Sequence, residues 1–296
     1  MKIGVIGVGR WGKKILNNIN EISDIEQICY RDNPETKLWL DEYFSNTKIT
    51  QNYKELLDNN NIETIVIATP ISSHFQIAKD SILAGKNVFI EKPIASNVRE
   101  CEELLNIKTH VKIFIGHIFL FNPAFIYLKK KLRNEDIESI EMSWNKYGSF
   151  EESIILNLLS HEISIVGDLI GFNFSDTQVN RAEKQITNLD ILEISFLVNE
   201  KIRCNININR VSHQKSKELS VYCKSGVIYR LSGQELFQAS EKEENLQLIY
   251  KDNKDLIKSE FLSFFNSILG KGEIIPDRQF GLNILKSLEY IDSILT

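Results

Sequence analysis

The sequence is short of the features that mark several classes of protein. Cysteine occurs four times in 296 residues, with neither a C-x-x-C pair nor a metal-ligand spacing to the five histidines. We therefore expect buried thiols, with no metal site and no disulfide. No apolar run approaches the ~18 residues that cross a bilayer, because the longest, 113–121, contains Gly116 and His117.

Positive charge is also scarce where it would indicate nucleic acid or secretion. The formal net charge is −5, and the one basic cluster, Lys129–Lys131, is too short to follow a phosphate backbone. The short apolar stretch at the N-terminus meets Arg10 and Lys13 with no cleavage-like segment, which is not the pattern of a signal peptide. We expect a cytoplasmic protein that binds neither nucleic acid nor membranes.

The first 120 residues alternate apolar strands with helical patterns. The predicted strands are 2–6, 25–30, 64–68, 88–90 and 112–118, and the predicted helices between them include 13–19, 35–44 and 74–84. Continuous apolar strands that alternate with helices are typical of a parallel sheet covered on both faces. The sequence therefore predicts an α/β fold whose residues 1–120 form a doubly wound Rossmann domain.

From Pro123 onward the pattern changes. Apolar and polar residues alternate along 192–198 and 202–208, which indicates an antiparallel sheet with one buried face. A further strand is predicted near 137–147, and helices are predicted at 124–132, 154–170, 255–269 and 278–294. We expect residues 121–296 to form a C-terminal α+β domain with an open, mainly antiparallel sheet.

Glycine is rare, with 14 in the chain, yet four of them fall within the first 12 residues. Gly7, Gly9 and Gly12 fit G-x-G-x-x-G directly after a strand and at the start of a helix. In that context the glycines allow a tight turn, a close approach of a pyrophosphate and close helix–strand packing. The sequence predicts a dinucleotide site whose glycine turn consists of Gly7, Val8, Gly9, Arg10, Trp11 and Gly12.

The end of the second strand bears on the choice of cofactor. NAD sites usually place an acidic side chain there, about 20 residues beyond the glycines, on the ribose 2′-hydroxyl. Here Tyr30 stands at the expected position and Arg31 follows it. Arginine pairs with a 2′-phosphate, so NADP(H) is favoured over NAD(H). Asp32 keeps NAD open, because a shift of one residue would restore the carboxylate.

A second block of motifs lies between residues 64 and 95. It contains Ala68-Thr69-Pro70, His74, Ala84-Gly85-Lys86 and Glu91-Lys92-Pro93. In these motifs, their order and their spacing behind the glycine turn, the chain resembles the glucose–fructose oxidoreductase, inositol dehydrogenase and rhizopine-catabolism (Gfo/Idh/MocA) family. The resemblance implies hydride transfer between a nicotinamide and a sugar or polyol carbon, and an open C-terminal sheet that often mediates oligomers.

The resemblance also assigns roles to residues. Lys92 corresponds to the family's motif lysine, which contacts cofactor and substrate, and His161 to its second acid–base group. The expected cofactor contacts of this block are Thr69, Pro70, His74, Glu91 and Lys92, and the expected substrate contacts are Lys92, His117, Asn122, Asn157 and His161.

Simple chemistry supports Lys92 and leaves alternatives for its neighbours. Lys92 follows a parallel strand, at the edge where ligands bind in open α/β sheets. A partly desolvated amine beside a positive nicotinamide has a lowered pKa, which suits acid–base catalysis. Glu91 fits a salt-bridge partner or a modulator of Lys92, His74 fits a helix cap or a cofactor contact, and His117 fits a structural or a substrate-binding histidine.

The helix predicted at 154–170 is apolar around most of its circumference, which indicates burial. Asn157, His161, Ser164 and Asp168 nevertheless share one stripe, and buried polar groups need polar partners. We expect this stripe to face a cleft between the domains, or His161 to bond a neighbouring carbonyl. Family members commonly carry an aspartate four residues before the histidine, where this chain has Asn157.

These observations favour an NAD(P)-dependent oxidoreductase acting on a sugar or nucleotide-linked sugar, assembled as a homodimer or homotetramer through the C-terminal sheet. One alternative is a cofactor-binding regulator or scaffold without turnover. Another is sugar hydrolysis or elimination assisted by a tightly held, recycled cofactor. Lys92 and His161, both present, favour the enzyme.

Overall fold

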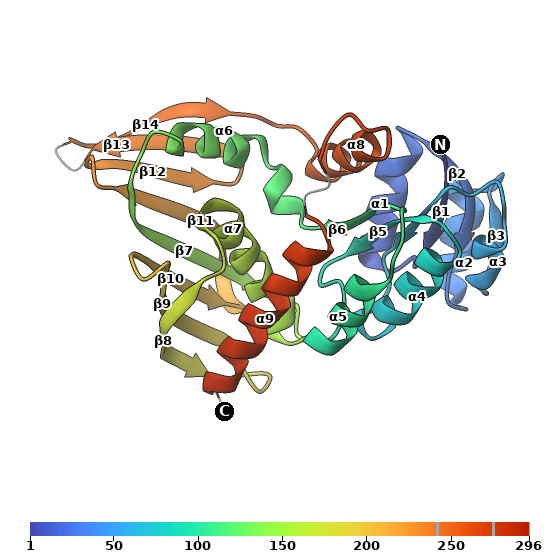
Figure 1. The fold of residues 1–296 in the computed structure, drawn as a ribbon, viewed down its shortest axis with the longest axis horizontal. Coiled ribbons are helices and arrows are strands. Elements are labelled where there is room, and N and C mark those ends of the chain that lie inside the picture. The colour runs from blue at the N-terminus through green and yellow to red at the C-terminus, as the bar shows by residue number, and fades with distance from the viewer. Residues whose placement is uncertain (241–242, 274–275, 296) are drawn as a thin grey trace. The chain divides into compact units, whose positions relative to one another are not determined.

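The computed structural model describes residues 1–240, 243–273 and 276–295 and divides the chain into two units (Figure 1). The first unit contains residues 1–117 and 255–282, and the second contains 118–254 and the residues from 283 onward. The sequence analysis had placed 255–282 in the C-terminal domain. The grouping differs because a terminal segment packs against the first sheet, a long-range contact that local sequence patterns do not encode.

The first unit is built on a six-stranded parallel sheet in the order β3-β2-β1-β4-β5-β6, as the apolar strands predicted. Its strands are β1 (Lys2–Ile6), β2 (Asp24–Cys29), β3 (Lys48–Thr50), β4 (Thr64–Ile67), β5 (Asn87–Glu91) and β6 (Ile113–Gly116). Its helices are α1 (Arg10–Asn20), α2 (Pro34–Tyr43), α3 (Lys54–Leu57), α4 (Ile71–Leu83), α5 (Val98–Asn106), α8 (Leu256–Ile268) and the first turn of α9 (Arg278–Leu295).

Aromatic packing holds α8 on this sheet. The ring of Phe261 stacks on Phe89 of β5 with centroids 4.2 Å apart, and Phe264 packs on Phe114 of β6 at 5.4 Å. All four side chains are almost completely buried. Burial of such rings contributes on the order of 2–3 kcal/mol each, which explains why the segment belongs with the first unit.

The second unit contains an eight-stranded sheet in the order β14-β13-β12-β11-β7-β10-β9-β8. Its strands are β7 (Ile137–Tyr147), β8 (Phe174–Glu183), β9 (Ile191–Val198), β10 (Ile202–Asn209), β11 (Val211–Cys223), β12 (Val227–Ser232), β13 (Glu235–Ser240) and β14 (Glu243–Lys251). Only the β7–β10 pair is parallel among the described strand pairs, so the expectation of a mainly antiparallel sheet is confirmed.

Helices cover one face of this sheet, with α6 (Pro123–Leu132) lying across β12, β13 and β14 (Figure 1). The 3₁₀ turn η1 (Ile118–Phe121) contacts α7 (Ser160–Ile170). The single helix expected at 154–170 is instead a π-helical turn, η2 (Ile155–Leu159), that leads into α7. Such π turns widen a helix locally and are frequent at functional sites.

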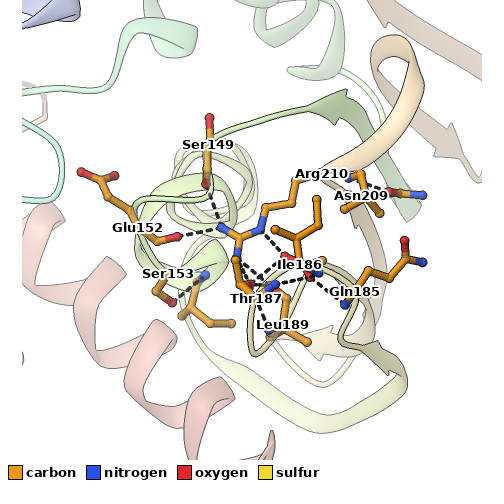
Figure 2. A network of polar contacts seen from close by, with 12 residues as sticks. Ser149, Glu152, Ser153, Gln185, Ile186, Thr187, Leu189, Asn209 and Arg210 are labelled. Carbon is orange, nitrogen blue, oxygen red and sulfur yellow. Dashed lines mark hydrogen bonds and ion pairs between the residues drawn. The ribbon is translucent and has the colours of Figure 1, made fainter.

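A buried ion pair fixes the segment that enters this helix (Figure 2). The guanidinium of Arg210, only 2% exposed, donates through Nε to Asp190 Oδ1 at 3.0 Å. Its Nη1 donates to the carbonyls of Ser149 and Glu152 at 2.8 and 2.7 Å. Although burial opposes ionisation, hydrogen bonds from the Thr187 hydroxyl and from main-chain amides hold the pKa of Asp190 well below its usual range.

The four cysteines are buried free thiols, as expected. Burial raises the pKa of the Cys204 thiol to about 12 and that of Cys29 to about 11, which leaves both protonated and unreactive. Within the described residues, no helix is both long and apolar enough to cross a membrane.

Candidate functional site

Two of the three motif glycines are required by close packing. A Cβ on Gly7, whose φ is +104°, would lie 2.4 Å from the carbonyl oxygen of Ala68. A Cβ on Gly12 would lie 2.3 Å from the carbonyl oxygen of Gly7. Side chains at either position would therefore separate α1 from β1 and β4. Gly9 differs, because no described atom lies within 4 Å of the place where its Cβ would be.

The N-terminus of α1 also lacks a protein partner that other helices have. Within the described chain, no side chain caps this end, where Gly9 is the N-cap, and its first turn holds no acidic residue. Four other helices receive a side-chain cap, from Asn33, Asn97, Asn122 and Asp255. Free N–H groups at a positive dipole end bind phosphate. Together with the open space at Gly9, this geometry fits the pyrophosphate of a dinucleotide.

The flanking residues of the turn are placed differently from one another. Val8 is buried in the core, whereas Arg10 is exposed in the first turn of α1. Trp11 is half-buried, and its indole donates to the carboxylate of Glu91 at 2.7 Å. The glycine turn is thereby linked to the end of β5, directly before Lys92.

The residues expected at the ribose lie at the end of β2. Tyr30 is buried and its amide donates to the carbonyl of Thr50 at 3.1 Å, so its phenol ring belongs to the core. Arg31 and Asp32 are both exposed directly after it. Asn33 then caps α2 through the amide of Thr36 at 3.0 Å. Both Arg31 and Asp32 are accessible from solvent at this edge of the sheet.

His74 connects two loops at the same edge. Its two ring nitrogens lie 2.8 Å from the carbonyl oxygens of Pro93 and Thr69. The ring is buried, and burial lowers its pKa against the opposing effect of the two carbonyls. His74 thus connects the turn before exposed Pro70 to the turn after Lys92, and its expected contact with the cofactor remains a prediction.

Glu91 is a carboxylate in an unusual environment. Burial raises its pKa to about 7, although the Trp11 indole and the neighbouring Lys92 ammonium favour ionisation. Glu260 of α8 is also buried, with a pKa well above the usual value, first because of burial and second because of the charge of Glu91. The charge of Lys92 thus favours the ionised form of Glu91, and an effect of Glu91 on the acid–base behaviour of Lys92 remains a prediction.

Lys92 begins the loop that follows β5, at the carboxyl edge of the parallel sheet, and the Lys92–Pro93 peptide is cis.

His117, at the end of β6, is almost fully buried and packs edge-on against Phe280 at 5.9 Å. Burial, followed by the positive charge of Lys92, lowers the pKa of His117 to about 3. His117 is consequently neutral at ordinary pH and available only as a hydrogen-bonding group.

His161 lies in the second unit among aromatic rings. It is 8% exposed, with its ring 4.9 Å from the centroid of Phe119 and 5.6 Å from that of Trp144. The Ser164 hydroxyl donates to the carbonyl of His161 at 2.7 Å. Asn157 lies one turn earlier, within η2. The imidazole thus packs edge-on against Phe119 and at a tilt against Trp144.

The polar stripe and Asn122 are explained in part by contacts within the second unit. Asp168 pairs with Lys129 of α6 at 2.6 Å, so it does not extend the site around His161. Asn122 accepts from the amide of Ala124 at 2.9 Å and donates to the carbonyl of Gly233 at 2.6 Å. Both ends of its amide therefore bond main-chain groups of the second unit, and its expected contact with a substrate remains a prediction.

The sequence analysis missed a buried ion pair next to His161. Glu162 on α7 pairs with Lys217 on β11, and the Lys217 ammonium also lies over Trp144 and Phe119. A glutamate among the apolar residues of a helix expected to be buried, outside its polar stripe, was the signal for such a partner. Among the described residues, no group of three or more His, Cys, Asp or Glu side chains is arranged to hold a metal ion.

Comparisons with known proteins agree with this geometry. Residues 1–117 match the model of a family described as "Oxidoreductase family, NAD-binding Rossmann fold" (GFO_IDH_MocA). Over 208 residues the chain is 28% identical to an uncharacterised oxidoreductase of Synechocystis, covering 59% of this chain and 56% of that protein. Over 226 residues it is 23% identical to UDP-N-acetylglucosamine 3-dehydrogenase of Acidithiobacillus ferrooxidans, covering 75% and 71%. An uncharacterised oxidoreductase of Bacillus subtilis is 31% identical over 138 residues, covering 45% and 40%.

Solved structures extend the likeness in fold to nearly the whole chain. A structure of the Acidithiobacillus ferrooxidans dehydrogenase superposes with a TM-score of 0.90 at 20% identity, covering 99% of this chain and 97% of that one. Biliverdin reductase from Synechocystis, solved with biliverdin and NADP⁺, gives 0.81 at 14% identity, with 99% and 98% covered. In contrast, the sequence matches span only about half of the Synechocystis and Bacillus relatives, 56% and 40%.

The pKa of Glu91 predicts a pH-dependent effect of Glu91→Gln. The unfolded carboxyl loses its proton near ~4.3 and the folded one near 7, so the native state binds more protons between these values. Wild-type stability therefore falls as pH rises through this window, by about 4 kcal/mol at most. Glutamine keeps an acceptor for Trp11 but carries no charge. Thermal unfolding without cofactor should show a midpoint gain at pH 8 that disappears at pH 5.

Glu63→Gln is the matched control, because Glu63 is exposed and should change the midpoint little at either pH. A gain for Glu91→Gln that is the same at both pH values would show that ionisation of this carboxyl is not what the substitution removes.

Proposed function

We propose that this chain is an oxidoreductase of the Gfo/Idh/MocA family, whose model residues 1–117 match, and that it transfers hydride between NADP(H) and a hydroxyl- or keto-bearing carbon of a sugar or nucleotide-linked sugar. The observation that carries this proposal is the open, uncapped glycine turn joined through Trp11 and Glu91 to Lys92. The motif thus links the cofactor turn to a candidate acid–base group by one hydrogen bond and one peptide.

The proposed division of labour follows from the environments of the residues. The backbone at Gly9 receives the pyrophosphate, and the bound nicotinamide supplies hydride chemistry. Lys92 takes the proton from the substrate hydroxyl in the oxidation direction and returns it in reduction. His161 assists as a second acid–base group, held by ring contacts, with Asn157 where relatives of this family commonly have aspartate. An amide orients an imidazole but stabilises its charged form less than a carboxylate does.

Substitution of the two proposed acid–base residues should have unequal effects. Loss of a positioned acid–base group typically costs about 10²–10⁴-fold in rate. We expect Lys92→Ala to abolish turnover with cofactor affinity largely intact, and His161→Ala to cost less. The measurement is kcat at 340 nm on a substrate identified by screening free and nucleotide-linked sugars with both NAD and NADP.

Lys108→Ala and His110→Ala are matched controls, since both side chains are exposed, and each should retain wild-type kcat. A larger loss for His161→Ala than for Lys92→Ala would overturn the assignment of roles. Cofactor binding without turnover of any sugar would favour the alternative of a regulator or scaffold, for which the replacement at Asn157 would then be evidence.

The exposed pair Arg31 and Asp32 generates a prediction about cofactor choice. We propose that Arg31 pairs with the 2′-phosphate of NADP(H), because Tyr30 is turned into the core and leaves Arg31 at the edge of the sheet. Arg31→Ala should weaken NADPH in titration calorimetry by about tenfold or more and leave NADH nearly unchanged. Asp32→Asn should not weaken NADPH. Equal losses for both cofactors in Arg31→Ala would refute the assignment.

The outer face of the second sheet generates a prediction about assembly. Polar side chains there surround a hollow of about 370 Å³, including Asn205, Asn207, Tyr222 and Arg230. We propose that a second copy of the chain covers this face and forms a homodimer, or a homotetramer by a further contact. Light scattering at micromolar concentration should give a multiple of the 34.2 kDa chain mass. A monomer mass would contradict the proposal.

A further inference from the structure

Lys217 lies against two aromatic rings of the second unit, Trp144 and Phe119. It pairs in register with Trp144 across β11 and β7, and its Nζ lies 3.8 Å from the Trp144 ring centroid. The same Nζ lies 4.5 Å from the centroid of Phe119, and these two rings are the ones that contact His161. The ammonium forms an ion pair with Glu162, the residue that follows His161 on α7.

Fold stability does not explain why this pair is charged. The Glu162 side chain is 2% exposed and that of Lys217 is 22% exposed. Burial raises the pKa of Glu162 and lowers that of Lys217, and in each case the partner's charge opposes the shift. Desolvation of two charges costs several kcal/mol per ion, and apolar replacements of buried pairs are often neutral or stabilising. The charges therefore call for a functional reason.

The pair leaves hydrogen-bonding capacity unused. Glu162 Oε2 is buried and has no hydrogen-bond partner among the residues that the structure describes. An ammonium has three N–H donors. The ion pair with Glu162 does not use all three donors of the Lys217 ammonium. An unsatisfied acceptor in an apolar surrounding is costly, and more so when it belongs to a charged group. A ligand hydroxyl that donates to Oε2 would satisfy that acceptor. A neighbouring hydroxyl could accept from a remaining N–H of Lys217 Nζ.

The chemistry of the ion pair and the two rings selects a class of ligand. An ammonium donor and a carboxylate acceptor side by side match two neighbouring hydroxyl groups, one accepting and one donating. The half-buried Phe119 and Trp144 rings offer apolar surface to the C–H groups of the same ligand. The pair is neutral overall, so it gives no net attraction to a phosphate or a carboxylate.

We propose that Lys217 and Glu162 hold two neighbouring hydroxyl groups of a neutral sugar ring, with Phe119 and Trp144 beside its C–H groups. The proposal rests on the proposed function and names the part of the substrate that the second unit recognises. Lys217 is then a substrate-binding residue that determines specificity for an uncharged polyol ring over the corresponding sugar acid.

The test compares single and paired substitutions. Glu162→Gln/Lys217→Met replaces the ion pair by an uncharged pair of similar size and should keep the wild-type unfolding midpoint within a few degrees. Its KM for a neutral sugar should rise by about 10- to 100-fold, with cofactor affinity unchanged and kcat changed less than KM. The wild-type preference for the neutral sugar over its uronic acid should fall in the double variant. Lys215→Met, an exposed position on the same strand, should keep the wild-type KM and preference.

A merely structural pair gives a different result. In that case the double variant would regain stability together with wild-type KM and sugar preference, and the proposal would be overturned. If the double variant does not fold, Lys217→Arg replaces it, because it keeps the charge but moves the donors. A raised KM in Lys217→Arg supports the proposal, and an unchanged KM overturns it.

Failure of the proposed function can be recognised separately. Saturation-transfer NMR with the holoprotein reports sugar binding without turnover. Binding by wild type that is lost in the double variant supports the subsite even if no sugar reacts, and then only hydride transfer is in error. Turnover of a neutral sugar with no dependence on Lys217 or Glu162 leaves the proposed function standing and overturns the subsite.

Discussion

The close contact between the start of α1 and the end of β1 is the constraint on which the first unit depends. A side chain at Gly12 would meet the Gly7 carbonyl at 2.3 Å, so α1 can begin this near the sheet only with glycine there. That position brings the indole of Trp11 to Glu91, and Glu91 adjoins Lys92. The glycine turn in the first twelve residues is thus connected to the proposed acid–base residue Lys92 through the hydrogen bond between Trp11 and Glu91.

The second unit uses two buried ion pairs in opposite ways. Arg210 and Asp190 are surrounded by main-chain and hydroxyl partners, and a network satisfied in this way specifies one arrangement of the segment before η2. Glu162 and Lys217 differ, because Glu162 Oε2 has no hydrogen-bond partner among the described residues and the Lys217 ammonium lies over two aromatic rings. The first pair fits a structural role, and the second fits a site that awaits polar groups from a ligand.

Sequence patterns predicted what depends on neighbouring residues. The glycine turn, the strand alternation in β9 and β10 and the placement of Lys92 after a parallel strand all follow from short-range rules. Contacts across long separations were not predictable: Glu162 and Lys217 lie 55 positions apart. The polar atoms of Asn122 and His74 contact main-chain groups of other loops, and a sequence motif does not reveal such contacts.

The helix that carries His161 shows how the missing aspartate changes the site. Asn157, within the π turn, stands where the resemblance leads us to expect the aspartate. The amide of Asn157 places no charge beside the imidazole. The buried carboxylate nearest in sequence, Glu162, is bound to Lys217 instead. Positive and negative charge on this side are therefore paired with each other, and ring contacts hold the imidazole. In the proposed function this arrangement assigns the main acid–base role to Lys92, and in the proposed subsite the ion pair recognises the hydroxyl groups.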